Sequence, residues 1–179
     1  MNLILPPQEI IFETFILRKL KHTDAASITK HITSEIVRYT ANIPYPYTEK
    51  NAQAFIKLSL KKNYQERALV YGIQINNEIV GICSIDSIDN INRKGILGYW
   101  LAKEHWGKKI TSQAAKKVVE IAFNNCNLHR IEVEHFEENI ASKKIIEKLG
   151  FQLEGIKRDI FFRENHWHNS FIYSLIKKE

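Results

Sequence analysis

Residues 139–151 carry the signs of a helix with both ends marked, placed directly after a strand-like segment. Asn139 is a favoured N-cap residue, because its side-chain oxygen can accept a hydrogen bond from a free N–H of the first turn. Ser142 falls one turn later on nearly the same face, and Gly150 stands where many helices end in a left-handed residue. The apolar stripe of this helix consists of Ile145, Ile146 and Leu149. Ligands bind at strand ends in open α/β sheets, so the stretch predicts either an ordinary capped helix or one wall of a binding site.

The remaining periodicities predict a mixed α/β order for the rest of the chain. Asn76 and Asn77 join two of the strands into a hairpin, since Asn tolerates the positive φ of tight turns. The expected strands are 15–18, 70–75, 78–85, 95–101, 131–136 and 171–176. The expected helices are a short one opening at Thr23, one after the turn at Pro44–Thr48 with Ala52, Phe55, Ile56 and Leu60 on one face, one over 110–124, and the helix after Asn139. The broad apolar face of 110–124 would lie against the sheet.

Length and composition indicate one ordinary globular domain over residues 1–179. Hydrophobic residues make up 44% and charged residues 26% of the chain, which is typical of such domains. No apolar stretch approaches the roughly 20 residues that span a bilayer, and the first residues lack the features of a secretory signal. Cys83 and Cys126 are too far apart to suggest a disulfide framework or a metal site, so we expect a cytoplasmic protein with no membrane partner.

The net charge of +6 has three readings: solubility alone, a polyanion such as RNA or the ribosome, or a phosphate-rich small ligand. Most lysines are scattered and are expected to be solvated. Lys108-Lys109 differs, because this pair falls where the 110–124 helix begins. No interleaved aromatic–basic platform is present, so sequence-specific binding of nucleic acid is not expected.

Residues 102–112 connect a strand to the 110–124 helix and form the second informative segment. A strand–turn–helix element directs backbone N–H groups and the positive end of the helix dipole toward one point, which suits an anion. Gly107 lets a ligand approach the backbone, and Lys108-Lys109 add positive charge there. The alternative is a basic helix start after a plain glycine turn.

With these segments in place, the chain resembles the GNAT superfamily of acyl-CoA-dependent N-acetyltransferases over nearly its whole length. The resemblance is densest in Gly98-Tyr99-Trp100-Leu101, in Trp106-Gly107-Lys108 and in 139–151. Within the superfamily it is closest to the RimJ/RimL-type acetyltransferases of ribosomal proteins, including the serine acetyltransferases. It implies an α/β fold with a mostly antiparallel central sheet of about seven strands, a splayed parallel pair and about four flanking helices.

The resemblance also implies roles for residues. Acetyl-CoA, the cosubstrate, would enter the gap between the splayed strands, where the backbone of Trp100 and Leu101 would contact its acetyl and pantetheine portions. Ser142 would protonate or stabilise the departing thiolate, Asn139 would bind the pantetheine arm and Lys144 would lie near the phosphates. The pyrophosphate loop and the helix start would be Trp106, Gly107, Lys108, Lys109, Ile110, Thr111 and Ser112.

This chain departs from the pattern of its relatives at several positions. Lys109 replaces a glycine of the phosphate loop and Thr111 replaces Ala or Gly. A positive φ at Lys109 would cost of order 1–2 kcal/mol, whereas a negative φ would make the extra ammonium a simple gain for phosphate binding. Ile96 and Asn169 stand where many relatives have acidic residues, and Ile146 stands where others have a tyrosine acid. The acid role therefore falls on Ser142 or water, and the base is unassigned.

The sequence shows no obvious general base, and this favours an α-amine as the acceptor of the acetyl group. A free α-amine has a pKa near 7.7–8.0 and is partly neutral at pH 7, whereas a lysine or polyamine amine near 10 needs a base. Glu134, Glu137 and Glu138 are nearby in sequence but read more readily as solvated acids. His166 and His168 are expected in a turn, and no metal-ligand spacing is seen.

Three functions follow from these expectations. The first is acetylation of a protein N-terminus, for example that of a ribosomal protein, by direct attack in a ternary complex. The second is acetylation of a small amine such as a polyamine or an aminoglycoside. The third is an acyl-CoA-binding module with little catalysis. The acceptor and the choice between monomer and homodimer are left open by the sequence.

Overall fold

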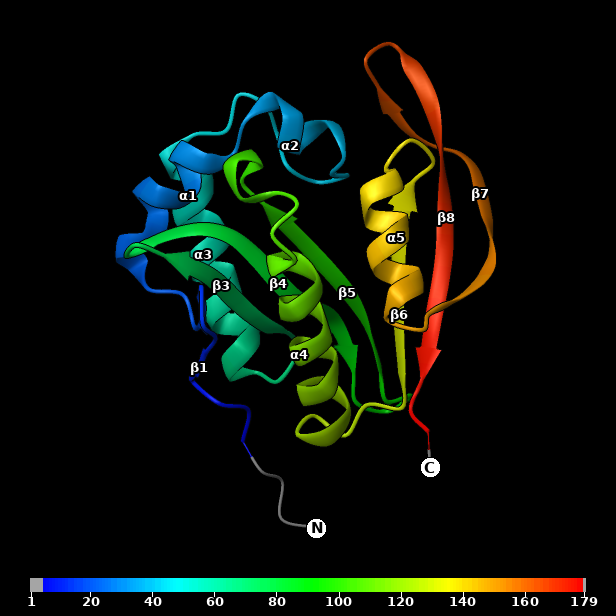
Figure 1. Cartoon of the computed structure of the whole chain (residues 1–179), viewed down its shortest axis with the longest axis horizontal. Helices are drawn as coiled ribbons and strands as arrows, with labels where there is room; N and C mark the ends of the chain where they lie inside the picture. Colours follow the sequence, from blue (N-terminus) through cyan, green and yellow to red (C-terminus); the bar gives the residue numbers. More distant parts are fainter. Residues whose placement is uncertain (1–4, 179) are drawn as a thin grey trace.

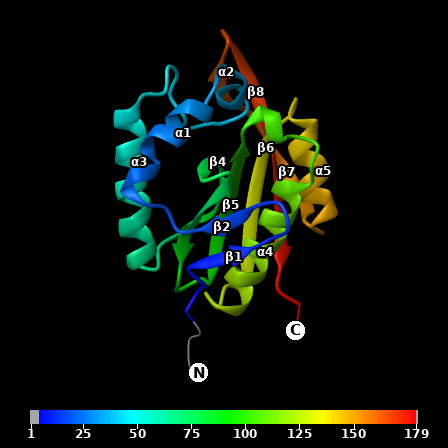
Figure 2. The same cartoon turned by 60° about the vertical axis from the view of Figure 1, so that its left-hand side comes forward.

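The computed structural model describes residues 5–178, which form one eight-stranded mixed sheet with helices on both faces (Figures 1 and 2). Along the sheet the strands run in the order β1-β2-β3-β4-β5-β6-β8-β7. The strands are β1 (Glu9–Ile11), β2 (Ile16–Arg18), β3 (Leu69–Ile75), β4 (Glu78–Asp89), β5 (Lys94–Leu101), β6 (Arg130–Phe136), β7 (Gln152–Arg163) and β8 (His166–Ile176). The helices are α1 (Ala25–His31), α2 (Ser34–Arg38), α3 (Glu49–Tyr64), α4 (Ile110–Asn124) and α5 (Ile140–Lys148), with 3-10 turns at His22–Asp24 and Lys103–His105.

Two apolar cores lie on opposite faces of this sheet. Figure 2 shows α1 and α3 on one side and α4 and α5 on the other. Strand alternation divides β3 between them: Tyr71 and Ile73 belong to the core under α4, and Val70 to the core under α3. The predicted apolar faces are confirmed, since Ala114 and Val118 of α4 and Ile56 of α3 are fully buried.

Several local expectations are confirmed closely. The β3–β4 hairpin turns at Asn76 and Asn77, whose φ values are 48° and 66°, as a primed turn requires. Helix α4 spans the predicted 110–124. Asn139 caps α5 by accepting a hydrogen bond from the backbone N–H of Ser142 at 3.0 Å. The fold class is likewise confirmed, with eight strands and five α-helices in the described part of the chain.

The parallel strands β5 and β6 diverge partway along their length. They pair at three positions, Lys94 to Arg130, Gly95 to Ile131 and Ile96 to Glu132. Beyond Ile96 each strand stays paired only with its other neighbour, β5 with β4 and β6 with β8. The gap therefore exposes the backbone edge of the second half of β5, whose polar groups need partners from elsewhere. This splay positions the site described next.

No helix among the described residues has the length and apolar character needed to cross a membrane.

Candidate active site

A cavity of about 660 Å³ opens where β5 and β6 diverge. Its walls come from the end of β5, the loop before α4, the first turns of α4 and α5, and the region of α2. The predicted site residues that line it are Trp100, Leu101, Trp106, Gly107, Lys109, Ile110, Thr111, Ser112, Asn139, Ser142 and Lys144. Lys108 is the predicted residue that falls outside this lining. Segments more than 40 residues apart in sequence thus meet around one cavity.

The loop between β5 and α4 is held against the end of the strand. The indole N–H of Trp106 donates to the carbonyl oxygen of Leu101 at 2.7 Å. Gly107 has a φ of +74°, and a Cβ added there would meet open space. Within the described part of the chain no side chain caps the N-terminus of α4, so N–H groups of its first turn remain available to an anion.

Lys109 occupies the left-handed region, with φ 62° and ψ 5°. Of the two alternatives for this residue, the positive φ is therefore the one observed. A lysine in this conformation carries strain of about 1–2 kcal/mol relative to glycine. Its carbonyl oxygen accepts hydrogen bonds from the Ser112 hydroxyl at 2.8 Å and from the backbone N–H of Gln113 at 3.1 Å. The strained residue is fixed by the first turn of α4 and lines the cavity.

Ser142 has a partner that the sequence did not reveal. Its hydroxyl oxygen lies 2.8 Å from that of Tyr99 on β5, and Ser142 is 7% exposed. Burial raises the pKa of Tyr99 well above its usual value, although the hydrogen bond with Ser142 opposes that rise. Tyr99 therefore stays a neutral phenol. The phenol that reaches Ser142 is that of Tyr99 on β5. Ile146, which stands where some relatives have a tyrosine acid, is fully buried in the core.

Among residues 5–178, two carboxylates line the cavity, those of Glu35 and Glu138. A hydrogen bond from Lys103, 3.0 Å away, lowers the pKa of Glu35 to about 2. Glu138 is paired instead with His168, whose Nδ1 lies 3.0 Å from its Oε1. Burial acts to raise the pKa of Glu138, but its own backbone N–H and His168 hold it below the ordinary value. Both side chains are therefore anionic at neutral pH.

The other two acids considered in the sequence do not reach the cavity lining. Glu134 pairs with Lys157 at 3.1 Å and accepts from Ser170 at 3.2 Å. Glu137 accepts from the amide of Asn169 at 3.0 Å. Glu138 differs from both, since it contributes to the wall of the cavity.

The expected turn around Trp167 is wrong. The chain turns at Glu164 and Asn165, where φ is 49° and 63°, and His166 to His168 begin β8. The sequence placed the turn too late because polar residues extend on both sides of it. Side chains two apart on a strand share a face, so His166 and His168 point the same way.

The tip of the β7–β8 hairpin contacts α2 and the segment after it. Arg163 donates to the carbonyl oxygen of Ala41, and Arg38 lies 3.6 Å from Glu164. In Figure 1 the hairpin rises beside α5 toward α2. Tyr39 and Thr40, between these contacts, line the cavity.

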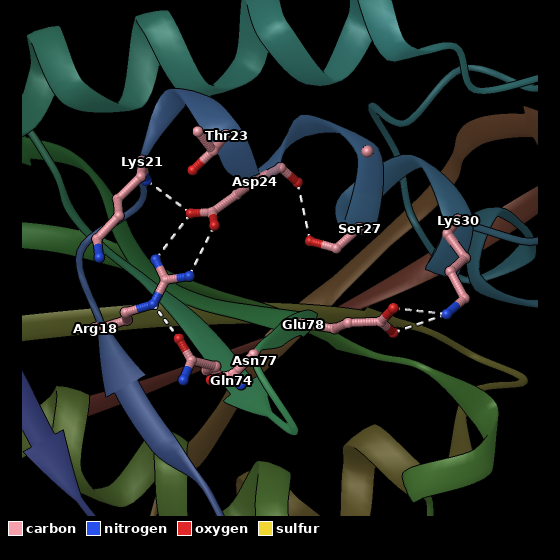
Figure 3. A pocket seen from close by; sticks show the side chains of 10 residues that line it. Arg18, Lys21, Thr23, Asp24, Ser27, Lys30, Gln74, Asn77 and Glu78 are labelled. Carbon is pink, nitrogen blue, oxygen red and sulfur yellow. Dashed lines mark hydrogen bonds and ion pairs between the residues drawn. The ribbon is translucent and has the colours of Figure 1, made fainter.

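A second cavity, about 470 Å³, lies where the segment before α1 meets the β3–β4 hairpin (Figure 3). Asp24 accepts two hydrogen bonds from the guanidinium of Arg18, at 2.7 and 2.8 Å, and a third from the backbone N–H of Lys21. Lys30 is paired with Glu78 at 2.7 Å. None of the predicted site residues lines this cavity, and its ion pairs connect α1 to the sheet.

Comparisons with known proteins agree with the fold. Residues 14–152 match the family described as "Acetyltransferase (GNAT) domain". The chain is 31% identical over 170 residues to the N-acetyltransferase p20 of Bacillus licheniformis, covering 93% of this chain and 95% of that protein.

Two Escherichia coli enzymes are more distant. The ribosomal-protein-serine acetyltransferase is 25% identical over 129 residues, covering 72% of this chain and 70% of the enzyme. The spermidine N(1)-acetyltransferase is 24% identical over 140 residues, covering 76% and 72%.

Among solved structures, the microcin C7 self-immunity acetyltransferase MccE, in complex with acetyl-CoA and AMP, superposes with a TM-score of 0.85. The sequences are 23% identical, and the match covers 97% of this chain and 98% of that one. At this identity the likeness establishes the fold alone.

Proposed function

The chain belongs to the GNAT family of acetyltransferases and uses acetyl-CoA as its cosubstrate, and from that premise we propose that it acetylates the N-terminal α-amine of a protein. The observation that carries this proposal is the splay of β5 from β6 beside the uncapped N-terminus of α4. A backbone edge suited to an acyl–pantetheine arm thereby adjoins an anion site suited to phosphates.

Binding of the donor follows from this arrangement. Gly107 and the first-turn N–H groups of α4 would hold the pyrophosphate, with the ammonium of Lys109 adding charge. Lys144 would lie at the phosphates from the α5 side, and the amide of Asn139 would contact the pantetheine arm. Trp100 and Leu101 would contact the acyl end from β5.

Transfer then needs three events. The neutral amine attacks the thioester carbon, the C–S bond breaks, and the thiolate takes up a proton while the amine loses one. Ser142 would give its proton to the sulfur and regain one through the Tyr99 phenol, 2.8 Å away, which would in turn take a proton from water. Glu138, anionic and on the cavity wall, would receive the proton of the attacking amine directly or through water.

An α-amine is the acceptor that this site serves most simply. A fraction of such amines is already neutral at pH 7, because their pKa is near 7.7–8.0. The similarity to a ribosomal-protein-serine acetyltransferase supports the same class of acceptor. The test measures acetyl transfer by mass spectrometry on a panel of peptides that differ in their first two residues. A lack of acetylated product on every peptide, with acetyl-CoA saturating, would sink the proposal.

A small polyamine is the second candidate. Two carboxylates, Glu35 and Glu138, line the cavity and would attract a polycation. The similarity to a spermidine N(1)-acetyltransferase points the same way, whereas the net charge of +6 opposes it. Spermidine and an aminoglycoside, run beside the peptides, decide between the acceptors by their relative kcat/KM.

We also propose that residues 1–179 act as one catalytic domain in the cytoplasm. The free thiols of Cys83 and Cys126 support a reducing compartment. The homodimer considered above can be tested by light scattering.

A further inference from the structure

Three side chains that can bind a metal ion lie close together beside the cavity, near the turn between β7 and β8. One ligand atom from each of Glu138, His166 and His168 lies within 4.8 Å of the other two. Glu138 comes from the loop before α5, and the two histidines come from the start of β8. Neither the sequence pattern nor the similarity to acetyltransferases assigns a role to this group.

The backbone brings these side chains together. Because the chain turns at Glu164 and Asn165, His166 and His168 lie on one face of β8. Their rings are 3.9 Å apart between centroids, and the His168 ring also stacks on Phe136 at 5.7 Å. His168 is thus fixed by packing, while His166 is exposed.

In each of the two histidines, Nδ1 has a polar partner, and Nε2 has no hydrogen bond within the described residues. Nδ1 of His168 faces Oε1 of Glu138 at 3.0 Å, and His168 is 8% exposed. Its Nε2 is buried and has no hydrogen-bond partner among residues 5–178. Nδ1 of His166 lies 3.1 Å from the carbonyl oxygen of Glu164, which leaves its Nε2 as the free ligand atom. His168 would therefore offer its Nδ1, which already faces Glu138, and His166 its Nε2, whereas Nε2 of His168 points away from the group.

Two imidazoles and one carboxylate suit a particular class of metal. Zn²⁺ accepts histidine nitrogens and carboxylate oxygens at about 2.0–2.2 Å, and sites with three protein ligands keep a fourth position open. Mg²⁺ and Ca²⁺ prefer oxygen ligands throughout. Tetrahedral Zn²⁺ separates its donor atoms by about 3.3 Å at these bond lengths. The Glu138–His168 pair is already 3.0 Å apart, which is close to the spacing that a shared Zn²⁺ requires, and the ligand atom of the exposed His166 lies within 4.8 Å of both.

We propose that Glu138, His166 and His168 form a Zn²⁺ site at the edge of the cavity where Glu138 lies. Binding of the metal does not depend on which amine the enzyme acetylates. The site has a consequence that does rest on the proposed function. A carboxylate bound to Zn²⁺ no longer accepts a proton from an amine, so Zn²⁺ inhibits acetyl transfer through Glu138.

Calorimetric titration of ZnCl₂ into the tag-free, chelator-treated full-length protein tests the site. We expect one Zn²⁺ per chain, and a loss of affinity of at least tenfold in His166→Ala and in Glu138→Gln. His129→Ala, which removes another exposed histidine, should bind like the unmodified protein. Equal affinity of His166→Ala and the unmodified protein would overturn the proposal. Thermal melts of each variant show that it is folded.

A crystal grown with one equivalent of Zn²⁺ provides an independent measurement. The anomalous peak of zinc should lie about 2.0–2.2 Å from an atom of each of the three side chains. A peak elsewhere, or none, rejects the site.

The inhibition is measured separately, as acetylated product by mass spectrometry, since Zn²⁺ also binds the released thiol. Zn²⁺ should inhibit the unmodified enzyme at concentrations that leave His166→Ala active. Binding without inhibition would keep the metal site but reject the role of Glu138 as proton acceptor.

Discussion

The hydroxyl groups of Tyr99 and Ser142 lie 2.8 Å apart across the gap between β5 and α5. Each is supplied by a different wall of the cavity, and each is largely excluded from water. The backbone N–H of Ser142 is held in turn by the side chain of Asn139. Three polar residues therefore form one connected chain at the point where the splayed strands leave room for a thioester.

Replacing Ser142 with Ala should lower kcat by about 100-fold, at the low end of what a general acid contributes because a thiolate leaves readily. KM for acetyl-CoA should change little, since Asn139 and the α4 loop remain. Tyr99→Phe should lower kcat less, because Ser142 can regain its proton from water. Steady-state kinetics on the best peptide provide both values. An unchanged kcat in Ser142→Ala would remove this residue from the mechanism.

Stability offers a second test of the same pair. Either single substitution leaves one buried hydroxyl without its partner, at about 1–3 kcal/mol, whereas the double variant removes both. The free energies of unfolding should therefore be non-additive, with a coupling of about 1 kcal/mol. Urea denaturation of the four proteins measures it. Simple additivity would show that the 2.8 Å contact contributes nothing to folding.

The sequence predicted those elements whose signals are local. The Asn76–Asn77 turn, the 110–124 helix and the Asn139 cap each depend on residues a few positions apart. Strand β7 was not predicted, because most of its side chains are exposed and its pairing with β8 shifts between Lys157 and Phe161. A strand with two polar faces lacks the alternation by which strands are recognised.

The site was predictable in its loop and cap but not in its contacts across the sheet. Tyr99 was visible in the Gly98–Leu101 strand, yet its contact with Ser142 depends on how far β5 and β6 separate. That separation follows from each strand's pairing with its outer neighbour, which involves residues far apart in sequence. The same holds for Glu138 and His168, 30 residues apart.

Substitutions of Asn139 can distinguish its role in capping α5 from a role in binding acetyl-CoA. Asn139→Ala removes the cap and should cost about 0.5–2 kcal/mol, which lowers Tm by about 2–4 °C per kcal/mol for a chain of this size. Asn139→Asp restores a cap and should restore Tm. If the amide also contacts pantetheine, KM for acetyl-CoA stays raised in Asn139→Asp. Recovery of both quantities together would limit Asn139 to capping.

Lys109 is expected to lower the stability of the fold through its strained backbone and to strengthen acetyl-CoA binding through its charge. Lys109→Gly relieves about 1–2 kcal/mol of left-handed strain but gives the unfolded chain more freedom, worth about 0.4–1 kcal/mol. The free energy of unfolding should therefore rise by no more than about 1.6 kcal/mol. KM for acetyl-CoA should rise about fivefold, as expected for one lost charge worth about 1 kcal/mol. Lys108→Gly, which alters a neighbour outside the cavity lining, is the matched control. A rise in KM for Lys108→Gly alone would reverse the assignment.

Asp24 should make the fold sensitive to acid through its buried pair with Arg18 (Figure 3). Burial acts to raise the pKa of Asp24, but hydrogen bonds from Arg18 and Lys21 lower it below the ordinary value. A depressed carboxyl pKa contributes stability that is present above the unfolded pKa, near 3.9, and is lost as the pH falls through the folded pKa. Asp24→Asn should therefore cost about 3–5 kcal/mol at pH 7.

The difference in unfolding free energy between Asp24→Asn and the unmodified protein should shrink below about pH 4, where the unfolded carboxyl is protonated. Glu120→Gln makes the same change of charge in an exposed pair with Lys117 and should cost less than about 1 kcal/mol. Urea unfolding at pH 7, 5, 4 and 3 measures all three proteins. A cost for Asp24→Asn that equals that of Glu120→Gln, or that stays constant down to pH 3, would show that the pair does not hold α1 against the sheet.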